Sequence, residues 1–412
     1  MRNGTTSKQV SDVTEFPVTR IETISKGVID WDRVGYLEKP EPAYRLEQGD
    51  ILYSHINSVA HMGKVAIYSD LMPLYHGMNL MLLRPNREYV DPDFLFLLLS
   101  SEHARAYARR ECKSAINQAS LGQGEIKVLP VTLPPLYEQH CIAEILDTLD
   151  EAIQKTEQLI AKLKQIKQGL LHDLLTRGID ENGQLRDPIA HPEQFKDSVL
   201  GRIPLEWDVP RIRDIAVYVG SGVTPRGGSE VYRSEGVLFL RSQNIHFDGL
   251  HLDDVAYIDS RTHEQMSRSE VFPHDVLINI TGASIGRCCA VPEGIGPTNV
   301  NQHVCAIRTA EPRKEDAKYF ASVLTSYIGQ SQIDRLNAGG NREGLNYEQL
   351  RSFSVPWPRQ DERKRIAEVI SAHDKRLSDE EEYLQKLGLE KKGLMHDLLT
   401  GKVRVNINRE QG

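Results

Sequence analysis

Gly169-Leu170-Leu171-His172-Asp173-Leu174-Leu175-Thr176 returns as Gly393-Leu394-Met395-His396-Asp397-Leu398-Leu399-Thr400 later in the same 412-residue chain. Upstream, Ile142-Ala143-Glu144 returns as Ile366-Ala367-Glu368. Both pairs lie 224 positions apart (142 to 366 and 169 to 393), so the segment between them is repeated without a gap. That period is too long for a solenoid repeat and fits a whole domain plus a helix. The sequence therefore predicts a duplicated molecule with a pseudo-two-fold internal repeat.

The repeated segments have the features of two long helices. Each follows a proline stop and ends near a glycine, as helices often do. About 40 helical residues would span about 60 Å, which exceeds a normal globular helix and favours a coiled coil. We predict spacer helices at residues 138–178 and 359–401.

A heptad pattern of apolar residues supports the coiled coil and supplies the candidates for helix packing or subunit docking. Lys167 and Lys391 interrupt this pattern at matching positions, either to specify register or as ordinary solvent-edge lysines. The candidates are Ile142, Leu149, Ile153, Ile160, Leu163, Leu170, Ile366, Ile370, Leu377, Leu384, Leu387 and Leu394.

The regions before the helices contain short apolar runs bounded by Gly, Asn and Pro, which are typical of strands. Three runs recur in both halves: 49–53 with 274–278, 63–66 with 286–290, and 80–84 with 304–308. Residues 94–99 and 319–324 favour helices. The predicted fold class is α+β, with two globular α/β domains separated by two long antiparallel coiled-coil helices. The predicted segments are domain 1 at 1–137, helix 138–178, linker 179–200, domain 2 at 201–358, helix 359–401 and tail 402–412.

The two globular regions diverge while the helices stay alike, as expected for one scaffold that carries two different readers. The first copy also starts late, because Gly4-Thr5-Thr6 matches Gly222-Val223-Thr224 close to the initiator methionine. Residues 403–408 alternate like a strand. One hypothesis is that this tail completes the first domain; the alternatives are a disordered tail or a truncated N-terminus.

Bulk composition places the chain among ordinary soluble proteins. The apolar fraction is 40%, and no uninterrupted apolar stretch is long enough to span a membrane. The N-terminus has no apolar stretch of the kind found in secretory signals. The five cysteines are irregularly spaced and include no C-x-x-C pair, so we expect neither a zinc site nor disulfides. A cytoplasmic location follows. The net charge of −8 argues against a naked nucleic-acid binder but leaves room for a local basic face or for basic partner subunits.

No catalytic or cofactor motif was found. The chain lacks a phosphate-binding P-loop and a dinucleotide fingerprint. The repeated His172-Asp173 and His396-Asp397 pairs lie among leucines, and adjacent helix residues do not face each other, so helix packing or a subunit contact is favoured over proton transfer. We expect no catalytic residue, no metal and no bound cofactor.

The doubled arrangement resembles the specificity (S) subunit of type I restriction-modification systems. The residues that carry this resemblance are the stretches 133–142 and 357–366 before the helices, the helix-end blocks, and 220–225, 239–245 and 275–278 in the second domain. The resemblance implies a non-catalytic subunit in which each globular domain is a target recognition domain for one half of a bipartite, asymmetric DNA site. The helices would set the spacer and dock two methyltransferase (M) subunits. S-adenosylmethionine, ATP and Mg²⁺ would belong to the M and restriction (R) partners.

Such a reader needs side chains at base edges, where arginine suits guanine and Asn or Gln suits adenine. An ordinary surface or turn role is the alternative for each candidate. The candidates are Arg20, Ser54, His55, Asn57, Lys64, Thr224, Arg226, Arg241, Gln243, Asn244, Thr281, Ser284, Arg287, Asn341 and Arg342.

Two other functions are alternatives to DNA recognition. A coiled-coil scaffold that binds only protein would show no salt-dependent binding to a bipartite duplex. An autonomous adenine methyltransferase lacks both the cofactor motif and the catalytic motif.

Overall fold

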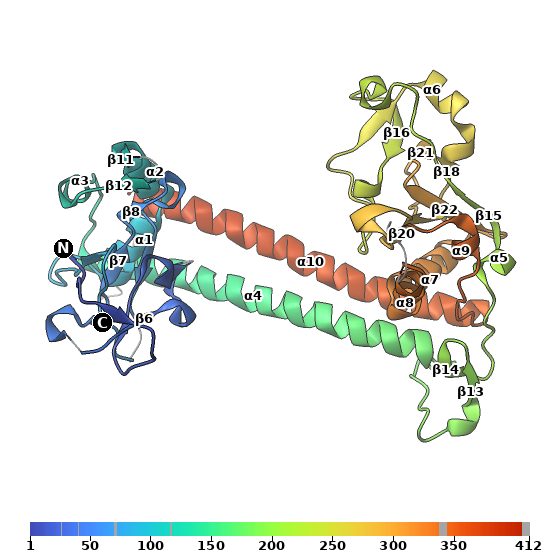
Figure 1. Cartoon of the computed structure of the whole chain (residues 1–412), viewed down its shortest axis with the longest axis horizontal. Coiled ribbons are helices and arrows are strands. Elements are labelled where there is room, and N and C mark those ends of the chain that lie inside the picture. The colour runs from blue at the N-terminus through green and yellow to red at the C-terminus, as the bar shows by residue number, and fades with distance from the viewer. Residues whose placement is uncertain (26, 40, 70–71, 116–117, 338–343, 406–412) are drawn as a thin grey trace, which may run out of the picture. The chain divides into compact units, whose positions relative to one another are not determined.

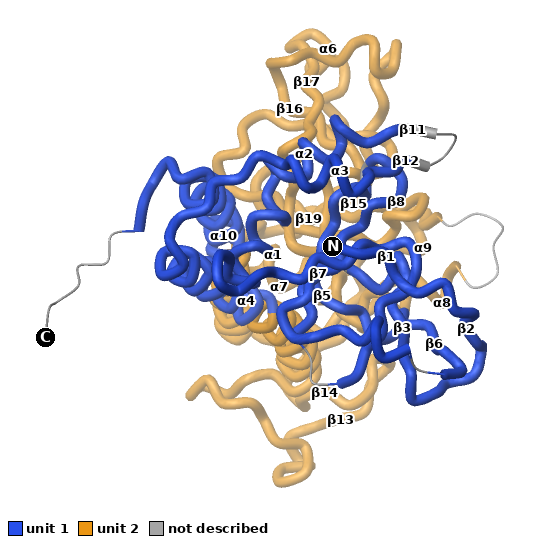
Figure 2. Tube along the Cα trace, turned by 90° about the vertical axis from the view of Figure 1, so that its left-hand side faces the viewer, with its two compact units in different colours: residues 1–157, 382–412 blue, residues 158–381 orange. Residues whose placement is uncertain are grey.

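The computed structural model describes residues 1–405 except 26, 40, 70–71, 116–117 and 338–343 (Figure 1). The chain forms two compact units: unit 1 holds residues 1–157 and the chain from 382 onward, and unit 2 holds residues 158–381 (Figure 2). Both boundaries fall inside long helices, so each unit combines one globular region with parts of both helices. Within the described residues, no helix has the length and apolar character that crossing a membrane requires.

Unit 1 is built around a four-stranded antiparallel sheet in the order β1-β10-β7-β9. A three-stranded sheet (β2-β6-β3), the pair β4-β5 and a second three-stranded sheet (β11-β12-β8) flank it. The strands are β1 (Arg2–Asn3), β2 (Gln9–Val10), β3 (Pro17–Val18), β4 (Ile24–Ser25), β5 (Val28–Ile29), β6 (Gly35–Leu37), β7 (Ile51–Tyr53), β8 (Ile56–Asn57), β9 (Val65–Ile67), β10 (Met81–Leu83), β11 (Lys113–Ala115) and β12 (Gln118–Ser120). The short helices are α1 (Pro92–Ser100), α2 (Glu102–Glu111) and α3 (Gln123–Lys127).

Unit 2 has an antiparallel sheet in the order β15-β22-β19-β20 and a mixed sheet in the order β17-β16-β21-β18. Only the β16–β21 pairing of the mixed sheet is parallel. The strands are β13 (Phe195–Ser198), β14 (Gly201–Pro204), β15 (Ala216–Ser221), β16 (Val237–Leu240), β17 (Ala256–Ile258), β18 (Glu270–Val271), β19 (Val276–Asn279), β20 (Cys288–Ala290), β21 (Thr298–Val300) and β22 (Val304–Thr309). The helices are α5 (Ile212–Ile215), α6 (Ser260–Gln265), α7 (Lys314–Thr325), α8 (Tyr327–Asn337) and α9 (Tyr347–Arg351).

The same sheet is built twice. The predicted strand pairs 49–53/274–278, 63–66/286–290 and 80–84/304–308 occupy equivalent places as β7/β19, β9/β20 and β10/β22, and α1 and α7 confirm the predicted helices. The short β1 takes the place of the longer β15. Gly4 and Gly222 follow these two strands, and a Cβ there would lie 1.8 Å from the Gly77 carbonyl oxygen or 1.7 Å from that of Val300. Only glycine fits both close approaches, which supports the predicted match of the two segments.

Each sheet also carries the same ion pair between an arginine and a buried aspartate. The Arg84 guanidinium donates to both carboxylate oxygens of Asp50, at 2.8 and 2.7 Å. Arg308 does the same to Asp275, at 2.7 and 2.6 Å. Both aspartates are buried, so these bidentate pairs supply the charge compensation that a buried carboxylate needs.

The long helices are α4 (Leu136–Thr176) and α10 (Gln360–Leu399), where the sequence predicted 138–178 and 359–401. In unit 1, Ile142 near the start of α4 and Leu398 near the end of α10 share one core. In unit 2, Leu174 near the end of α4 and Ile366 near the start of α10 share another. Each repeated helix therefore begins in the core of its own copy and ends in the core of the other, which explains why both ends of the helix recur in the sequence.

The lysines that interrupt the heptads form ion pairs between the helices. Lys167 contacts Asp374 at 2.6 Å, and Lys391 contacts Asp150. Asp150 and Asp374 occupy equivalent positions in the 224-residue repeat, as do Lys167 and Lys391. Burial opposes ionisation of Asp374, but hydrogen bonds from Lys167 and Lys318 outweigh burial and lower its pKa. Lys164 of α4 contacts Glu381 of α10 at 2.7 Å, whereas the later Lys167 contacts the earlier Asp374. The two helices are therefore antiparallel.

A glutamate near the start of each long helix binds the segment that follows the other long helix. Glu362 accepts hydrogen bonds from Arg186 at 2.5 and 3.2 Å, from the Ile179 amide at 3.0 Å and from Trp207 Nε1 at 3.0 Å. Its counterpart Glu138 accepts from Arg404 and from the Val405 amide. We call these contacts the Glu362 clamp and the Glu138 clamp.

The segments outside the helices differ in two ways from the sequence-based expectation. The predicted linker 179–200 is a folded part of unit 2, in which Ile179 and Phe195 are buried and β13 pairs with β14. Of the predicted tail strand, only residues 403–405 are described; these form no strand, and Val405 packs against the unit 1 core.

Candidate nucleic-acid interface

The β7–β9 connection of unit 1 and the β19–β20 connection of unit 2 are equivalent loops that carry predicted DNA-binding residues. Ser54, His55, Asn57 and Lys64 lie in or beside the first loop. Thr281, Ser284 and Arg287 lie in the second. The duplicated sheet thus presents the same loop twice with different side chains, which is the arrangement that two readers with different sequence preferences require.

In unit 1, part of this loop is buried. Ser54 is fully buried and accepts a hydrogen bond from Asn57 Nδ2 at 3.2 Å. His55 is 8% exposed, burial lowers its pKa, and its Nδ1 has no hydrogen-bond partner among the described residues. Ser54 and His55 therefore shape the loop, whereas Asn57 and Lys64 are half-buried and reach solvent. Arg20 lies elsewhere in unit 1, where its Nε donates to Oε1 of Gln9 in β2 at 2.7 Å.

In unit 2, Thr224 and Arg226 follow β15 and are exposed. Thr281 Oγ1 lies 2.7 Å from His303 Nδ1, while Ser284 and Arg287 are half-buried on the same loop. These side chains come from two connections of one sheet, so a single rigid element positions them.

Arg241 and Gln243 converge on the carboxylate of Asp254. Arg241 Nη2 donates to Asp254 Oδ1 at 3.2 Å, and Gln243 Nε2 donates to Asp254 Oδ2 at 2.6 Å. The Arg241 guanidinium also lies 5.7 Å from the ring centre of Tyr232. Asp254 holds both donors in place at an exposed position, where a base edge or a phosphate could compete for them.

Asn244 has a structural role in the same region. It is 2% exposed, and its Nδ2 donates to the carbonyl oxygens of His251 and Asp254 at 3.0 and 2.8 Å. Its Oδ1 accepts from the Arg241 amide at 2.9 Å. These bonds fix the turn that carries Arg241 and Gln243. The two remaining candidates, Asn341 and Arg342, lie outside the described residues.

Sequence reasoning missed Asp254, Tyr232 and His303, which contact the candidate side chains. No motif could have revealed them, because Asp254 and Tyr232 lie on either side of Arg241 in separate loops and His303 is distant from Thr281 in sequence. The repeat gave no signal either, because the two domains diverge at these loops.

The predicted helix-packing residues are all buried or half-buried. Ile142, Ile160, Leu163, Ile366, Ile370 and Leu387 are buried. The other six are half-buried: Leu149, Ile153, Leu170, Leu377, Leu384 and Leu394. The exposed surface of the helices comprises other residues, among them Ile145 and Val369, which are counterparts in the repeat.

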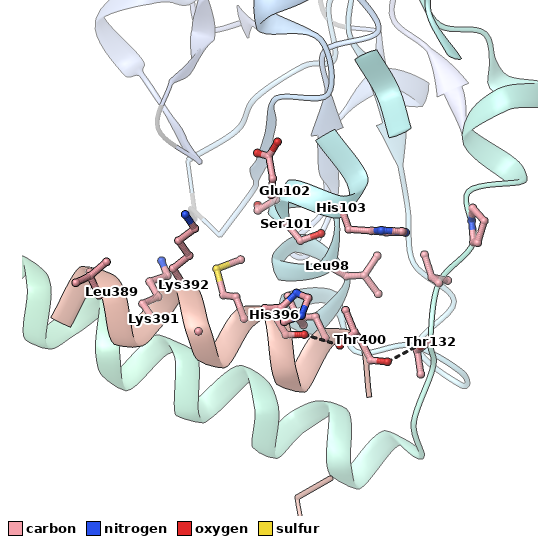
Figure 3. A pocket seen from close by; sticks show the side chains of 17 residues that line it. Leu98, Ser101, Glu102, His103, Thr132, Leu389, Lys391, Lys392, His396 and Thr400 are labelled. Atoms are coloured by element: carbon pink, nitrogen blue, oxygen red, sulfur yellow. Dashed lines mark hydrogen bonds between the residues drawn. The ribbon is translucent and has the colours of Figure 1, made fainter. Parts of the chain in front are cut away.

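A groove of about 1090 Å³ in unit 1 runs along the last turns of α10 (Figure 3). Its walls come from α10, from the α1–α2 junction and from residues 130–132. Leu389 is 71% exposed at one end, and Lys392 and His396 add polar atoms beside the apolar Leu98 and Met395. An apolar floor with a few polar groups at its margin suits a segment of a partner protein.

Two α+β regions that share one sheet topology but differ in their loops, in a chain with two long antiparallel helices, define a two-part recognition protein. The model of the type I restriction modification DNA specificity domain matches the chain twice, at residues 2–165 and 204–387. The chain belongs to this family of type I restriction-modification specificity subunits.

Relatives cover nearly the whole chain. The putative type I restriction enzyme MjaX specificity subunit of Methanocaldococcus jannaschii is 34% identical over 411 residues, covering 98% of this chain and 91% of the relative. The EcoBI specificity subunit of Escherichia coli is 27% identical over 274 residues, covering 62% of this chain and 54% of that protein.

Solved structures share the fold. The S subunit of a type I restriction-modification system from M. genitalium superposes with a TM-score of 0.55 at 15% identity, covering 97% of this chain and 92% of that one. A chain from a study of complex assembly and conformational transition of the type I R-M system gives a TM-score of 0.57 at 16% identity, covering 94% and 92%.

Proposed function

We propose that this chain is the sequence-specific DNA recognition subunit of a type I restriction-modification complex, and that each globular region reads one half of a bipartite, asymmetric double-stranded site. The observation that carries the proposal is the sheet β1-β10-β7-β9, which recurs as β15-β22-β19-β20 with different side chains on equivalent loops. Phosphate contacts would set the register of each region, and loop side chains would read base edges.

The antiparallel helices α4 and α10 set the spacer between the half-sites. Ion pairs between the helices in both units and apolar residues along their shared face support a fixed register. Because a helix rises 1.5 Å per residue, its length translates directly into a distance along DNA.

The chain itself performs no chemistry in this proposal. Two M subunits would dock on the repeated helix surfaces, and the groove along α10 is one candidate surface. The M subunits would use S-adenosylmethionine to methylate an adenine flipped out of the duplex, while the chain holds the flanking DNA. R subunits would add ATP- and Mg²⁺-dependent steps. We propose that the complex acts in the cytoplasm.

Selection from a random duplex library by the chain together with its M subunit tests this proposal. We expect enrichment of two short motifs at a constant spacing, with affinity that falls steeply as salt rises because phosphate contacts release counterions. A single contiguous motif would contradict the two-reader model. Absence of any salt-dependent duplex binding would favour the alternative of a protein-binding scaffold.

A matched pair of arginine variants tests the unit 2 loops. Arg226→Ala should weaken binding to the selected duplex, whereas Arg213→Ala, an exposed arginine on α5 outside the candidate loops, should leave binding unchanged. Equal effects of the two substitutions would remove the loop after β15 from the interface.

A further inference from the structure

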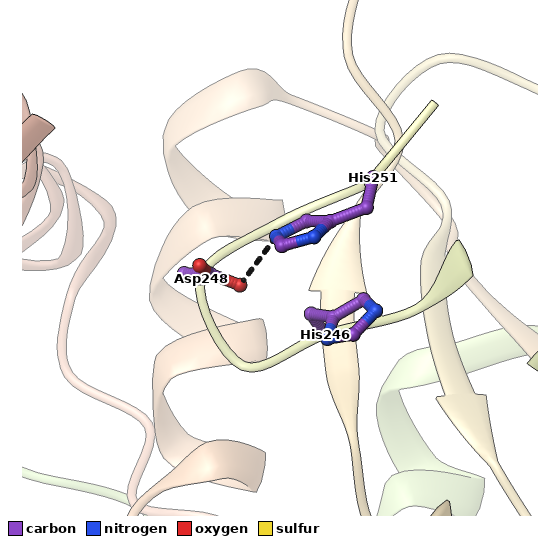
Figure 4. A group of neighbouring side chains, drawn as sticks. All are labelled: His246, Asp248 and His251. Carbon is purple, nitrogen blue, oxygen red and sulfur yellow. Dashed lines mark hydrogen bonds and ion pairs between the residues drawn. The ribbon is translucent and has the colours of Figure 1, made fainter. Parts of the chain in front are cut away.

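A hairpin of unit 2 brings His246, Asp248 and His251 together (Figure 4). Each side chain offers one ligand atom, and the three atoms all lie within 4.8 Å of one another. The two imidazole rings are stacked with centroids 3.9 Å apart, and Asp248 Oδ1 lies 3.0 Å from His251 Nε2. All three side chains reach solvent, so an ion can enter without opening the fold.

The backbone of this hairpin is held independently of any ion. The amides of His246 and Gly249 donate to each other's carbonyl oxygens, and the His251 amide donates to the carbonyl oxygen of the buried Asn244. Ile245, which forms a bridge with Leu250, is also buried. Coordination therefore requires only side-chain rotation, so little ordering of the chain opposes binding.

The hydrogen bonds of His246 prepare it as a ligand. Its Nε2 lies 2.8 Å from the carbonyl oxygen of Gln243. A carbonyl oxygen only accepts, so Nε2 carries the proton and the lone pair of the neutral ring lies on Nδ1. A metal-binding histidine usually donates the N–H of its other ring nitrogen, the one that does not bind the metal, to a backbone carbonyl or a carboxylate.

The spacing of the other two ligands also suits a metal. Atoms bound tetrahedrally to Zn²⁺ at about 2.0 Å lie about 3.3 Å apart. The Asp248–His251 contact needs to widen by only a few tenths of an ångström to match this. For Nε2 to bind the ion, the proton that it donates to the carboxylate must move through solvent to Nδ1, so the His251 ring stays neutral and its Nε2 lone pair becomes available.

We propose that His246 Nδ1, an Asp248 carboxylate oxygen and His251 Nε2 form a binding site for a divalent transition-metal ion of the Zn²⁺ class, with water as the fourth ligand. Two imidazoles, one carboxylate and an open position form a ligand set that Zn²⁺ accepts. The bound ion would cross-link both strands of the hairpin beside Gln243 and Asp254, and so stiffen a candidate reading loop. Metal binding itself does not depend on the proposed DNA function.

Calorimetric titration of the untagged full-length chain with Zn²⁺ tests the site. We expect one saturable site per chain, lost in His246→Gln and in His251→Gln and weakened in Asp248→Asn. The matched control is His191→Gln, because His191 is an exposed histidine with a carboxylate, Glu193, 3.3 Å away but forms no three-ligand cluster with other described residues. This control should bind one Zn²⁺ like the unchanged chain. Circular dichroism verifies that the variants, whose substituted side chains reach solvent, remain folded.

Titration with Co²⁺ identifies the ligand atoms. Visible bands of a four-coordinate nitrogen and oxygen site that disappear in His251→Gln support the proposal. A sulfur-to-cobalt charge-transfer band would overturn it, although burial raises the pKa of Cys289 and of Cys305 to about 12 and disfavours their thiolates. Failure of the unchanged chain to bind Zn²⁺ saturably, or equal Zn²⁺ binding by all four variants, would also overturn it.

Discussion

The Glu362 clamp should stabilise the protein more than the Glu138 clamp, although the two glutamates are counterparts in the repeat. The Glu362 carboxylate serves Arg186, whose side chain is 15% exposed, together with the Ile179 amide and the Trp207 indole. Glu362→Ala leaves these buried donors unpaired, and breaking a buried ion pair typically costs about 3–5 kcal/mol.

Glu138 has a more exposed partner. Arg404 is 58% exposed, so water can solvate its guanidinium after Glu138→Ala, and only the Val405 amide is left poorly satisfied. A cost of roughly 1–2 kcal/mol is expected. We therefore expect Glu362→Ala to be more destabilising than Glu138→Ala by about 2 kcal/mol. Glu362→Gln retains one acceptor oxygen, so its loss of stability should lie between those of the two alanine variants.

Urea unfolding followed by tryptophan emission measures the difference, because Trp207 and Trp357 report on unit 2 and Trp31 reports on unit 1. Glu368→Ala serves as the control, since Glu368 is exposed on α10 and lies 4.0 Å from Lys364, so less than about 0.5 kcal/mol should be lost. Equal losses of stability for Glu362→Ala and Glu138→Ala, or a loss for Glu362→Ala no greater than that of the control, would contradict the predicted difference between the two clamps.

Three further predictions concern the helices and the unit 1 core. Lys391→Asp and Asp150→Lys should each destabilise the chain, while the double exchange should recover stability with a coupling of about 0.5–1 kcal/mol, measured by a urea double-mutant cycle; no recovery would show that this ion pair does not stabilise the helix pair. Burial lowers the pKa of His76 to about 4, so the unfolded chain, with an ordinary pKa near 6.5, gains a proton that the folded state excludes. The free energy of unfolding should therefore be unaffected by His76 above about pH 6.5 and should fall as the pH drops toward 4, by about 2.5 kcal/mol at pH 4.5. The His76→Gln variant should lose less unfolding free energy than the unchanged chain between pH 7 and pH 4.5. Inserting seven residues in both α4 and α10 adds about 10 Å and should lengthen the preferred spacer by about 3 base pairs without altering the half-sites; altered half-sites with an unchanged spacer would contradict the ruler role.

Much of the scaffold could be predicted because repetition and hydrophobic periodicity are local properties of the sequence. The match of 49–53 with 274–278 and the heptads ending at Leu170 and Leu394 pointed to elements that the structure contains. The division into units inside α4 and α10 could not be predicted, because periodicity shows which face of a helix is buried but not which domain buries it.

The candidate interface was less predictable for a related reason. The amide of Asn244 has the same donors and acceptor whether it reads a base or fixes a turn, and only its burial in the fold distinguishes the two roles. The two clamps escaped detection because their arginines, Arg186 and Arg404, do not lie 224 residues apart, although the glutamates do. Tertiary contacts between divergent segments leave no mark on a single sequence.

Methylome mapping of a host that expresses the chain with its M subunit shows whether two independent readers share one helical frame, especially when it is repeated after residues 1–137 are exchanged for those of another specificity subunit. We expect a bipartite motif in which the exchange replaces one half-site and leaves the other half-site and the spacer unchanged. A change in both half-sites, or a motif without a spacer, would contradict the claim that two independent readers share one helical frame.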